Sequence, residues 1–446
     1  MTPPRPRLFS QLGQRQRGAA TLVIVMILFF IMAMMASFAS RNLVFEQRIA
    51  SNFYRAGVAF EVAEAGAEWA LGMLNGTNID AACLPTSDLT RSFRQRYLTM
   101  DAVTRGVTAS PGTMNKADCV RQADTASAAG EIANGWACRC PTVDGTDPAA
   151  DLAATTTQPG FSIAFQTPFE SRAGSIRLLS TACTGNVAAD CAQGDISHIA
   201  GDPAQGAAQV AIDVALVSAL KMPPAAPLIV RGSVTVNADA LGLHNTDAVS
   251  GGLLLLTGAA LPANLSETRL NSLPGTPGQQ AVISADASLA NASADKMFAT
   301  FFGMSPAHYR DQPALRRLAC AAGTDCGPAL AAAYRSGARL LWVDGPLNLN
   351  SDLQFQADAA ASPMLIIANG AVTLEGPMLF KGLIYARGHG SWANPSAMPA
   401  LLIGALLIEG NFQATGTVDL WYQAGVMDEL KNRNGSFVRV PGSWWH

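Results

Sequence analysis

The fold of this chain is decided by residues 17–76, RGAATLVIVMILFFIMAMMASFASRNLVFEQRIASNFYRAGVAFEVAEAGAEWALGMLNG. Gly18 to Ser40 is a run of 23 residues without a charged side chain. As a helix, such a run is long enough to cross about 30 Å of hydrocarbon. No turn signal separates this run from the segment after it, and Asn75-Gly76 is a typical helix stop. We therefore expect one helix from Ala19 to Leu74, with residues 19–40 in a membrane.

The charges before this helix predict its orientation. Residues 1–17 contain no acidic residue and four arginines, Arg5, Arg7, Arg15 and Arg17. Such a bias holds the N-terminus in the cytoplasm. A secretory signal would have a shorter apolar core and a cleavage site after small residues, whereas this run continues as helix. We therefore expect a single-pass protein with its bulk outside the cytoplasm.

Apolar side chains continue after the membrane segment at steps of three or four, which places them on one helix face. We call the aromatic and aliphatic members Phe45, Ile49, Phe53 and Phe60 the helix stripe. The stripe predicts a surface that packs on a folded domain or on a neighbouring subunit. Periodicity is not specific to one family, so the alternative is an ordinary anchor followed by a stalk.

Two motifs follow the apolar run in a fixed order. The first, of the form E-x-R-I-A-x-N, consists of Glu46, Arg48, Ile49, Ala50 and Asn52. The second, similar to AxxAAEAG, consists of Ala59, Phe60, Ala63, Glu64, Ala65 and Gly66. With the basic leader that ends in Gly18, this arrangement resembles the N-terminus of the PilX-type minor pilins of type IV pili. The resemblance covers about the first 75 residues.

The resemblance implies that residues 1–18 are a prepilin leader, which prepilin peptidase removes by cleaving between Gly18 and Ala19. Two positions depart from the family pattern. Ala19 stands where Phe is usual, and Val23 stands where Glu is usual. In filaments of this family the Glu is thought to neutralise the terminal amine of a neighbour, and a lone carboxylate in lipid is costly. The absence of the Glu therefore favours a subunit that starts the filament.

Eight cysteines follow the helix, and this even number predicts disulfides formed in an oxidising compartment. The short spacings of Cys183 to Cys191 and of Cys320 to Cys326 suit small closed loops, although spacing does not fix the pairing. Cys138 and Cys140 also compete as zinc ligands, but no CxxC pair or nearby histidine completes a tetrad, so we expect no metal. The disulfide candidates are Cys83, Cys119, Cys138, Cys140, Cys183, Cys191, Cys320 and Cys326.

Residues 76–221 are expected to form a pilin-like α/β head. The runs at 161–168, 175–183 and 208–220 have the composition of strands, and the last alternates apolar and polar residues. We therefore predict an α+β fold, in which the long N-terminal transmembrane or pilin helix packs on a small antiparallel sheet.

Residues 222–446 follow a proline-rich boundary and carry short apolar runs between glycines. Runs spaced by roughly 10 to 20 residues are typical of a β-solenoid, in which each coil buries its apolar face on the next. A β-sandwich is the alternative, because no strict repeat is present. The helical period of KMFATFFGMSPAHYR predicts a helical insertion at about 262–339.

The sequence contains no motif for a phosphate-binding loop, a zinc hydrolase, a serine nucleophile or a dinucleotide site. We therefore predict no enzyme, no catalytic residue and no cofactor. A net charge of −3 with 14% charged residues gives no basic excess for nucleic acid.

These features together indicate a minor pilin that primes or caps type IV pilus assembly at the tip, by helix packing and display of an extracellular domain. The resemblance implies the bacterial inner membrane first and the extracellular pilus later. The implied partners are other minor pilins, the major pilin, a pilus-tip adhesin and prepilin peptidase. One alternative is a type II secretion pseudopilin, which shares the helix logic. The other is a membrane-tethered β-helix protein that binds or cleaves polysaccharide.

Overall fold

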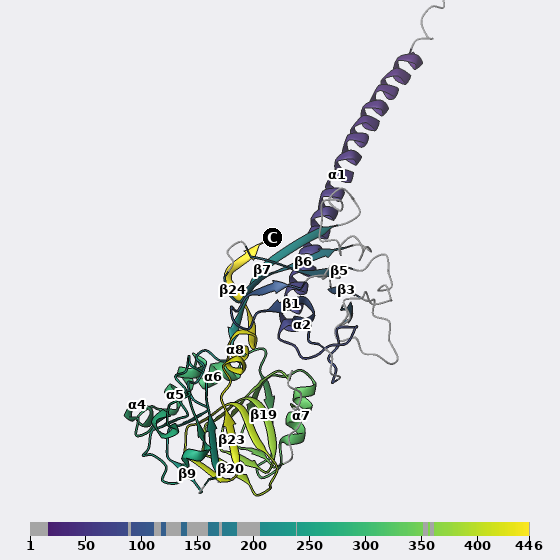
Figure 1. The fold of residues 1–446 in the computed structure, drawn as a ribbon. Coiled ribbons are helices and arrows are strands. Elements are labelled where there is room, and N and C mark those ends of the chain that lie inside the picture. Colours follow the sequence, from purple (N-terminus) through teal and green to yellow (C-terminus); the bar gives the residue numbers. More distant parts are fainter. Residues whose placement is uncertain are drawn as a thin grey trace, which may run out of the picture.

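The computed structural model describes residues 17–87, 91–110, 117–121, 135–140, 159–168, 172–184, 206–237, 239–350, 356 and 361–445. The chain forms a long helix, α1 (Arg17–Leu74), and two β-rich bodies (Figure 1). The helix projects from the first body, and the second body lies on the opposite side of the first. Its bounds confirm the single helix expected from Ala19 to Leu74. Asn75 and Gly76 close the helix with backbone hydrogen bonds to Gly72 and Met73, as the stop signal predicted.

The first body, which we call the head, is built on an antiparallel sheet against which the C-terminal part of α1 packs. Its strands β5 (Gly160–Gln166), β6 (Ser175–Cys183) and β7 (Ala207–Ser218) confirm the three predicted strands. The sheet order is β24-β7-β6-β5-β3-β4. The remaining elements are α2 (Phe93–Tyr97), β1 (Leu98–Met100), β2 (Val107–Ala109), β3 (Ala117–Arg121) and β4 (Trp136–Arg139). The helix on an antiparallel sheet is the predicted arrangement.

The second body is a large parallel-sheet domain. Eleven strands form one sheet, and β16-β18-β20-β22-β9 form a second. The chain alternates between the two sheets, so that β17 pairs with β19 while β18 pairs with β20, always parallel. The apolar residues between the sheets form one continuous core. An antiparallel β-sandwich does not fit this pairing.

The strands of this domain lie at the following bounds: β8 (Leu228–Val230), β9 (Val234–Val236), β10 (Leu241–His244), β11 (Leu255–Thr257), β12 (Leu270–Asn271), β13 (Val282–Ile283), β14 (Arg316–Leu318), β15 (Leu340–Val343), β16 (Leu347–Leu349), β17 (Met364–Ala368), β18 (Val372–Glu375), β19 (Met378–Ala386), β20 (Gly390–Asn394), β21 (Ala400–Ile408), β22 (Phe412–Gly416) and β23 (Val418–Trp421). The first strand, β8, pairs with β21 near the end of the chain, so the domain closes through long-range contacts.

Residues 262–339 are only partly the helical insertion that we expected. They contain η2 (Glu267–Arg269), η3 (Gly278–Ala281), α4 (Ala287–Ala290), α5 (Ala294–Phe302), α6 (Pro306–Arg310) and α7 (Gly327–Arg335). The same segment also supplies β12, β13 and β14 to the large sheet. Leu270 on β12 lies opposite Leu243, and Val282 on β13 lies opposite Leu255, both in parallel pairing. Helices α5 and α6 pack on an outer face of the sheet, where Phe298 and Phe302 contact Tyr385.

The end of the chain returns to the head. After α8 (Ala424–Asn432), β24 (Gly435–Trp445) pairs antiparallel with β7, with Gly435 opposite Ser218 and Phe437 opposite Leu216. The parallel-sheet domain is therefore inserted between two adjacent strands of the head sheet. We had assigned 222–446 to one β-rich domain, and its last strand belongs instead to the other sheet. Proline and glycine disfavour a strand in the sequence, and this segment, GSFVRVPGSWW, contains one proline and two glycines.

Candidate functional site

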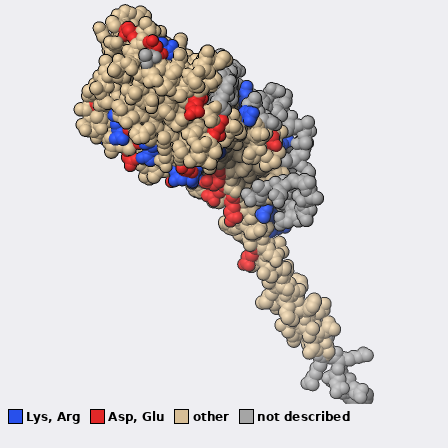
Figure 2. Space-filling model, turned by 90° about the horizontal axis from the view of Figure 1, so that it is seen from below, with Lys and Arg blue, Asp and Glu red and all other residues tan. Residues whose placement is uncertain are grey.

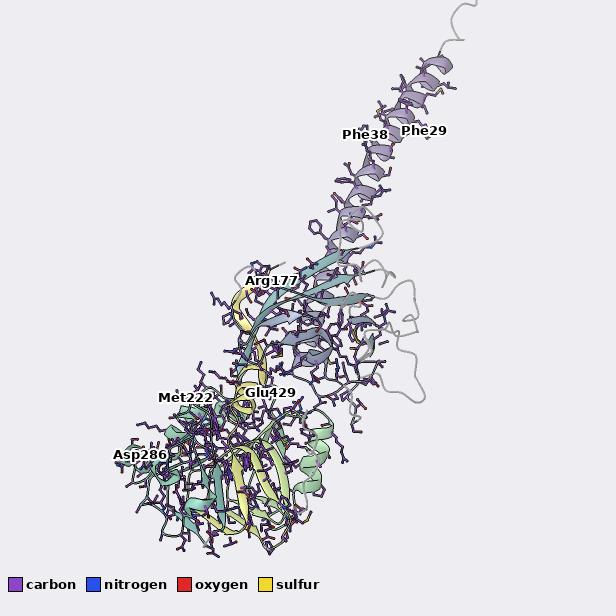
Figure 3. All side chains as sticks on the ribbon, viewed as in Figure 1. Phe29, Phe38, Arg177, Met222, Asp286 and Glu429 are labelled. Carbon is purple, nitrogen blue, oxygen red and sulfur yellow. A yellow bond between two sulfur atoms is a disulfide. The ribbon has the colours of Figure 1, made fainter. Side chains whose placement is uncertain are left out.

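Helix α1 has a free part and a packed part. The side chains from Leu22 to Phe38 stand exposed to the surroundings, and Phe29 and Phe38 project from the free part (Figure 3). The most apolar window of this helix has a mean hydropathy of 2.8 and none of it is buried, so length and composition allow it to cross a membrane. In Figure 2, most of the projecting length of α1 shows no charged side chain.

The helix stripe spans the change from the free part to the packed part. Phe45 is 65% exposed, Ile49 is 39% exposed and Phe53 is 75% exposed. Within the described residues, Phe60 is the stripe member whose ring contacts the head, with its centre 5.7 Å from that of Trp444 on β24. The head therefore leaves three members of the stripe uncovered, and their role as a packing face stays a prediction.

The packed part approaches the head through small side chains. Ala59, Ala63 and Ala70 are fully buried, and they fall on one face with Gly66. A Cβ atom at Gly66 would lie 2.4 Å from Ser180 Oγ and 2.8 Å from the ring of Phe161, which real contacts do not allow. The glycine of the second motif therefore lets α1 lie directly on β5 and β6. We had used this glycine only as part of a family pattern.

The N-terminal helix is similar to a known protein family. Residues 17–68 match the family model described as PilX N-terminal. The chain carries a PilX N-terminal region. This PilX region contains the free part of α1, the helix stripe and the contact at Gly66.

Other comparisons add no argument. A comparison with curated proteins found no match. Among solved structures, the competence-associated pilin ComZ from Thermus thermophilus is 10% identical, with 88% of this chain and 97% of that chain covered and a TM-score of 0.18. A likeness at this level supports neither a fold nor a function.

The predicted cleavage site lies at the start of the PilX region. Gly18 is exposed in the first turn of α1, next to Ala19. The leader before Arg17 lies outside the described residues. Cleavage between Gly18 and Ala19 stays a prediction.

The cysteines beyond the PilX region form disulfides, as their even number predicted. Cys83 is bonded to Cys140, and Cys119 on β3 is bonded to Cys138 on β4. Cys320 and Cys326 close the short loop expected from their spacing. Cys183 is also disulfide-bonded, and Cys191 lies outside the described residues. Cys138 and Cys140 are thus held in two different disulfides.

The parts of the chain that the structure describes contain no cluster of three or more His, Cys, Asp or Glu residues that could hold a metal ion. A different feature with functional geometry is the exposed apolar part of α1. Its exposed apolar side chains would stabilise an assembly, because covering apolar surface removes it from water and lowers the free energy.

Proposed function

We propose that this protein is a minor pilin that primes or caps assembly of a type IV pilus at its tip. The observation that carries the proposal is the PilX N-terminal region, whose helix is free and apolar before the head begins. The helix would rest in the inner membrane and then enter the helical core of the filament. Burial of one large apolar side chain contributes about 1.5–3 kcal/mol, so covering the exposed stripe would favour assembly.

A position at the tip is supported by two features. Val23 replaces the acidic residue usual in related helices, so this subunit offers no carboxylate to the terminal amine of a neighbour. The parallel-sheet domain lies on the side of the head away from the free end of α1, where a further subunit would otherwise stack (Figure 1). A subunit of this shape suits the end of a filament, with the domain displayed outward. The proposed role is structural and not enzymatic.

The proposal includes processing by prepilin peptidase between Gly18 and Ala19. N-terminal sequencing of the membrane-extracted protein should give Ala19 as the first residue in cells that have the peptidase. A start at Met1 in such cells would overturn the processing step. Cleavage near residue 40 would remove the whole apolar segment and overturn the pilin proposal.

The parallel-sheet domain is proposed to be a β-solenoid. Support comes from the regular alternation between two sheets, in which Val372 lies opposite Gly390 and Gly390 lies opposite Phe412. Each coil then advances by one strand spacing. A crystal structure of the extracytoplasmic region that shows antiparallel pairing of β19 with β21 would overturn it.

Deletion of the gene tests the function directly. We expect surface pili to be lost and to return on complementation, with the protein present at low abundance in sheared pili. The expected partners are the other minor pilins, the major pilin and a pilus-tip adhesin. If deletion instead leaves pili intact and stops export of a type II secretion substrate, the protein is a pseudopilin and the pilus proposal is wrong.

A further inference from the structure

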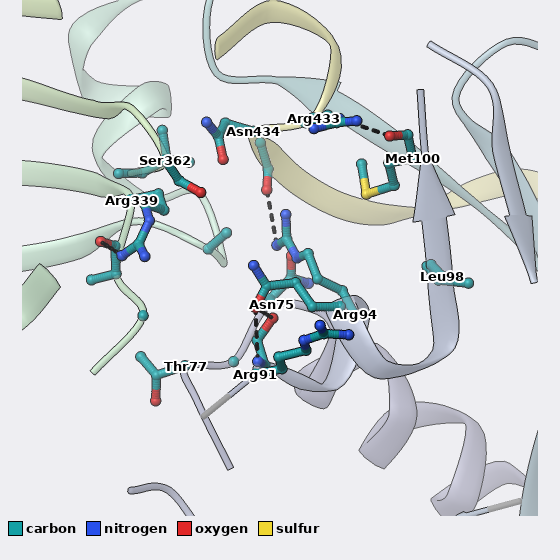
Figure 4. A pocket seen from close by; sticks show the side chains of 18 of the residues that line it. Asn75, Thr77, Arg91, Arg94, Leu98, Met100, Arg339, Ser362, Arg433 and Asn434 are labelled. Carbon is teal, nitrogen blue, oxygen red and sulfur yellow. Dashed lines mark hydrogen bonds between the residues drawn. The ribbon is translucent and has the colours of Figure 1, made fainter. Parts of the chain in front are cut away.

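A cavity of about 610 Å³ lies where the head meets the parallel-sheet domain. Most of its lining comes from three segments: residues near the end of α1 and in α2 and β1, residues 314–340, and the link from α8 to β24. Ser110 and Ser362 complete it. Figure 4 shows four arginines around this cavity: Arg91 and Arg94 from one segment, and Arg339 and Arg433 from two others. A volume of this size accommodates a small molecule.

Positive charge dominates the lining. Among the described residues, Glu429 is the only acidic residue that lines the cavity, whereas five arginines reach it: Arg91, Arg94, Arg316, Arg339 and Arg433. Within the described residues none of the five forms an ion pair with a carboxylate. We call this cavity the arginine pocket.

Backbone carbonyl groups hold the deeper arginines in place. Arg94 Nε donates to Leu74 O at 2.8 Å, and Arg316 Nη2 donates to Asn75 O at 2.9 Å. Arg339 Nη1 donates to Tyr334 O at 2.8 Å. These bonds fix the guanidinium groups while leaving their charge without a counter-ion.

Two buried donors in the lining lack a hydrogen-bond acceptor, which is uncommon in folded proteins. They are Arg339 Nε and Asn434 Nδ2. Burial, together with the nearby charge of Arg316, lowers the pKa of Arg94 to about 10. Burial also lowers the pKa of Arg316 and of Arg339. The arginine pocket is therefore a site where positive charge is both concentrated and unneutralised.

Glu429 can balance at most one of the five positive charges. Burial raises the pKa of its carboxyl group, which opposes the charged form, although Arg433, Lys381 and Arg339 act the other way. Unpaired buried charges cost several kcal/mol unless a counter-ion joins them. An anion that enters the pocket would supply that counter-ion.

We propose that the arginine pocket binds a small polyanion that carries two or more phosphate, sulfate or carboxylate groups. Guanidinium groups bind such oxyanions through paired, charge-assisted hydrogen bonds. Several arginines from separate segments match several anionic groups on one molecule. The ligand would contact the head through Arg91 and Arg94 and the parallel-sheet domain through Arg316 and Arg339, and so would join the two bodies.

Calorimetric titration of the full-length protein in detergent at low salt tests this inference. The probes are pyrophosphate for phosphate groups, citrate for carboxylate groups, and acetate as a singly charged comparison. We expect one site that binds pyrophosphate or citrate and not acetate, with an affinity that falls as salt is added. The tighter of the two probes identifies the class of anionic group.

The variant Arg91→Gln/Arg433→Gln removes two arginines whose side chains are exposed at the rim, so the fold should persist. Charge-assisted hydrogen bonds to the ligand would be lost, and we expect the affinity to fall about tenfold or more. The matched control Arg121→Gln/Arg335→Gln removes two exposed arginines outside the pocket and should bind as the parent does. Absence of binding by both polyanions, or an equal affinity in the pocket variant and the parent, overturns the proposal. Neither outcome depends on whether the protein is a pilin.

Discussion

Asn75 exchanges two hydrogen bonds with Phe437, a residue 362 positions away in the last strand. Its Nδ2 donates to Phe437 O at 2.9 Å, and its Oδ1 accepts from Phe437 N at 2.8 Å. The Asn75 carbonyl in turn accepts from Arg316 of the parallel-sheet domain. The residue after α1 therefore joins the helix, the last strand of the head and the inserted domain.

We expect Asn75→Ala to destabilise the protein by about 2–5 kcal/mol. The substitution leaves a buried N–H and a buried C=O of Phe437 without partners, and each such group costs about 1–3 kcal/mol. Thermal or denaturant unfolding of the purified protein measures the change. Asn291→Ala is the matched control, because Asn291 is exposed and the hydrogen bond recorded for it comes from its backbone. Equal stability of the two variants would show that the Asn75 pair contributes nothing.

The disulfides should differ in their contribution to stability. Cys83 and Cys140 are separated by 57 residues and Cys320 and Cys326 by 6 residues. The entropy of loop closure in the unfolded chain predicts a loss of about 4 kcal/mol for the longer loop and about 2 kcal/mol for the shorter one. We expect Cys83→Ser/Cys140→Ser to lower the melting temperature more than Cys320→Ser/Cys326→Ser. The reverse order would contradict this ranking.

The sequence predicted the elements whose formation depends on residues close together in the chain. The helix, its stop at Asn75 and the strands β5, β6 and β7 follow from apolar run length and periodicity. The return of β24 to β7 could not be predicted, because a short segment with Pro441 and two glycines pairs only when the rest of the sheet is present. The pairing of β8 with β21 is likewise set by tertiary packing.

The arginine pocket escaped prediction for the same reason. Arg94 and Arg339 are 245 positions apart in the sequence and meet only when the two bodies meet. No local motif marks either arginine in the sequence. For the helix stripe, periodicity placed Phe45 and Phe53 on one face of the helix. It could not predict which surface covers that face.

Glu409 should make stability depend on pH. Its side chain is buried, its Oε1 accepts from Tyr385 OH at 2.8 Å, and Arg387 Nε lies 3.5 Å away. Burial raises the pKa of its carboxyl group above the usual value, despite the opposing effects of Tyr385 and Arg387. The folded state then holds the proton more tightly than the unfolded state. The free energy of unfolding therefore falls as the pH rises from about 4.5 through the raised pKa.

Glu409→Gln removes this titration and keeps an oxygen that accepts from Tyr385. We expect the stability of the variant relative to the parent to improve from pH 4 to pH 7, as measured by denaturant unfolding at each pH. Glu375→Gln, at an exposed position, serves as the control. A difference between Glu409→Gln and the parent that is constant with pH would refute the assigned shift.

The last prediction concerns the helix stripe, and two adjacent aromatic residues allow a matched test. Phe53 on the stripe is 75% exposed, and Tyr54 off the stripe is 74% exposed. Substitution by Asp at either position should leave the isolated chain stable to within about 0.5 kcal/mol, because neither side chain is buried in it. In an assembled filament the stripe would be covered, and an unpaired carboxylate there costs several kcal/mol. Each 1.4 kcal/mol is about tenfold in an equilibrium, so we expect Phe53→Asp to reduce surface pili about tenfold or more and Tyr54→Asp to retain them. Counts of surface pili in complemented deletion cells, with immunoblots for abundance, make the comparison. Normal piliation with Phe53→Asp at normal abundance would remove the stripe as an interface, whereas equal loss with both variants would show that the buried face is wider than the stripe.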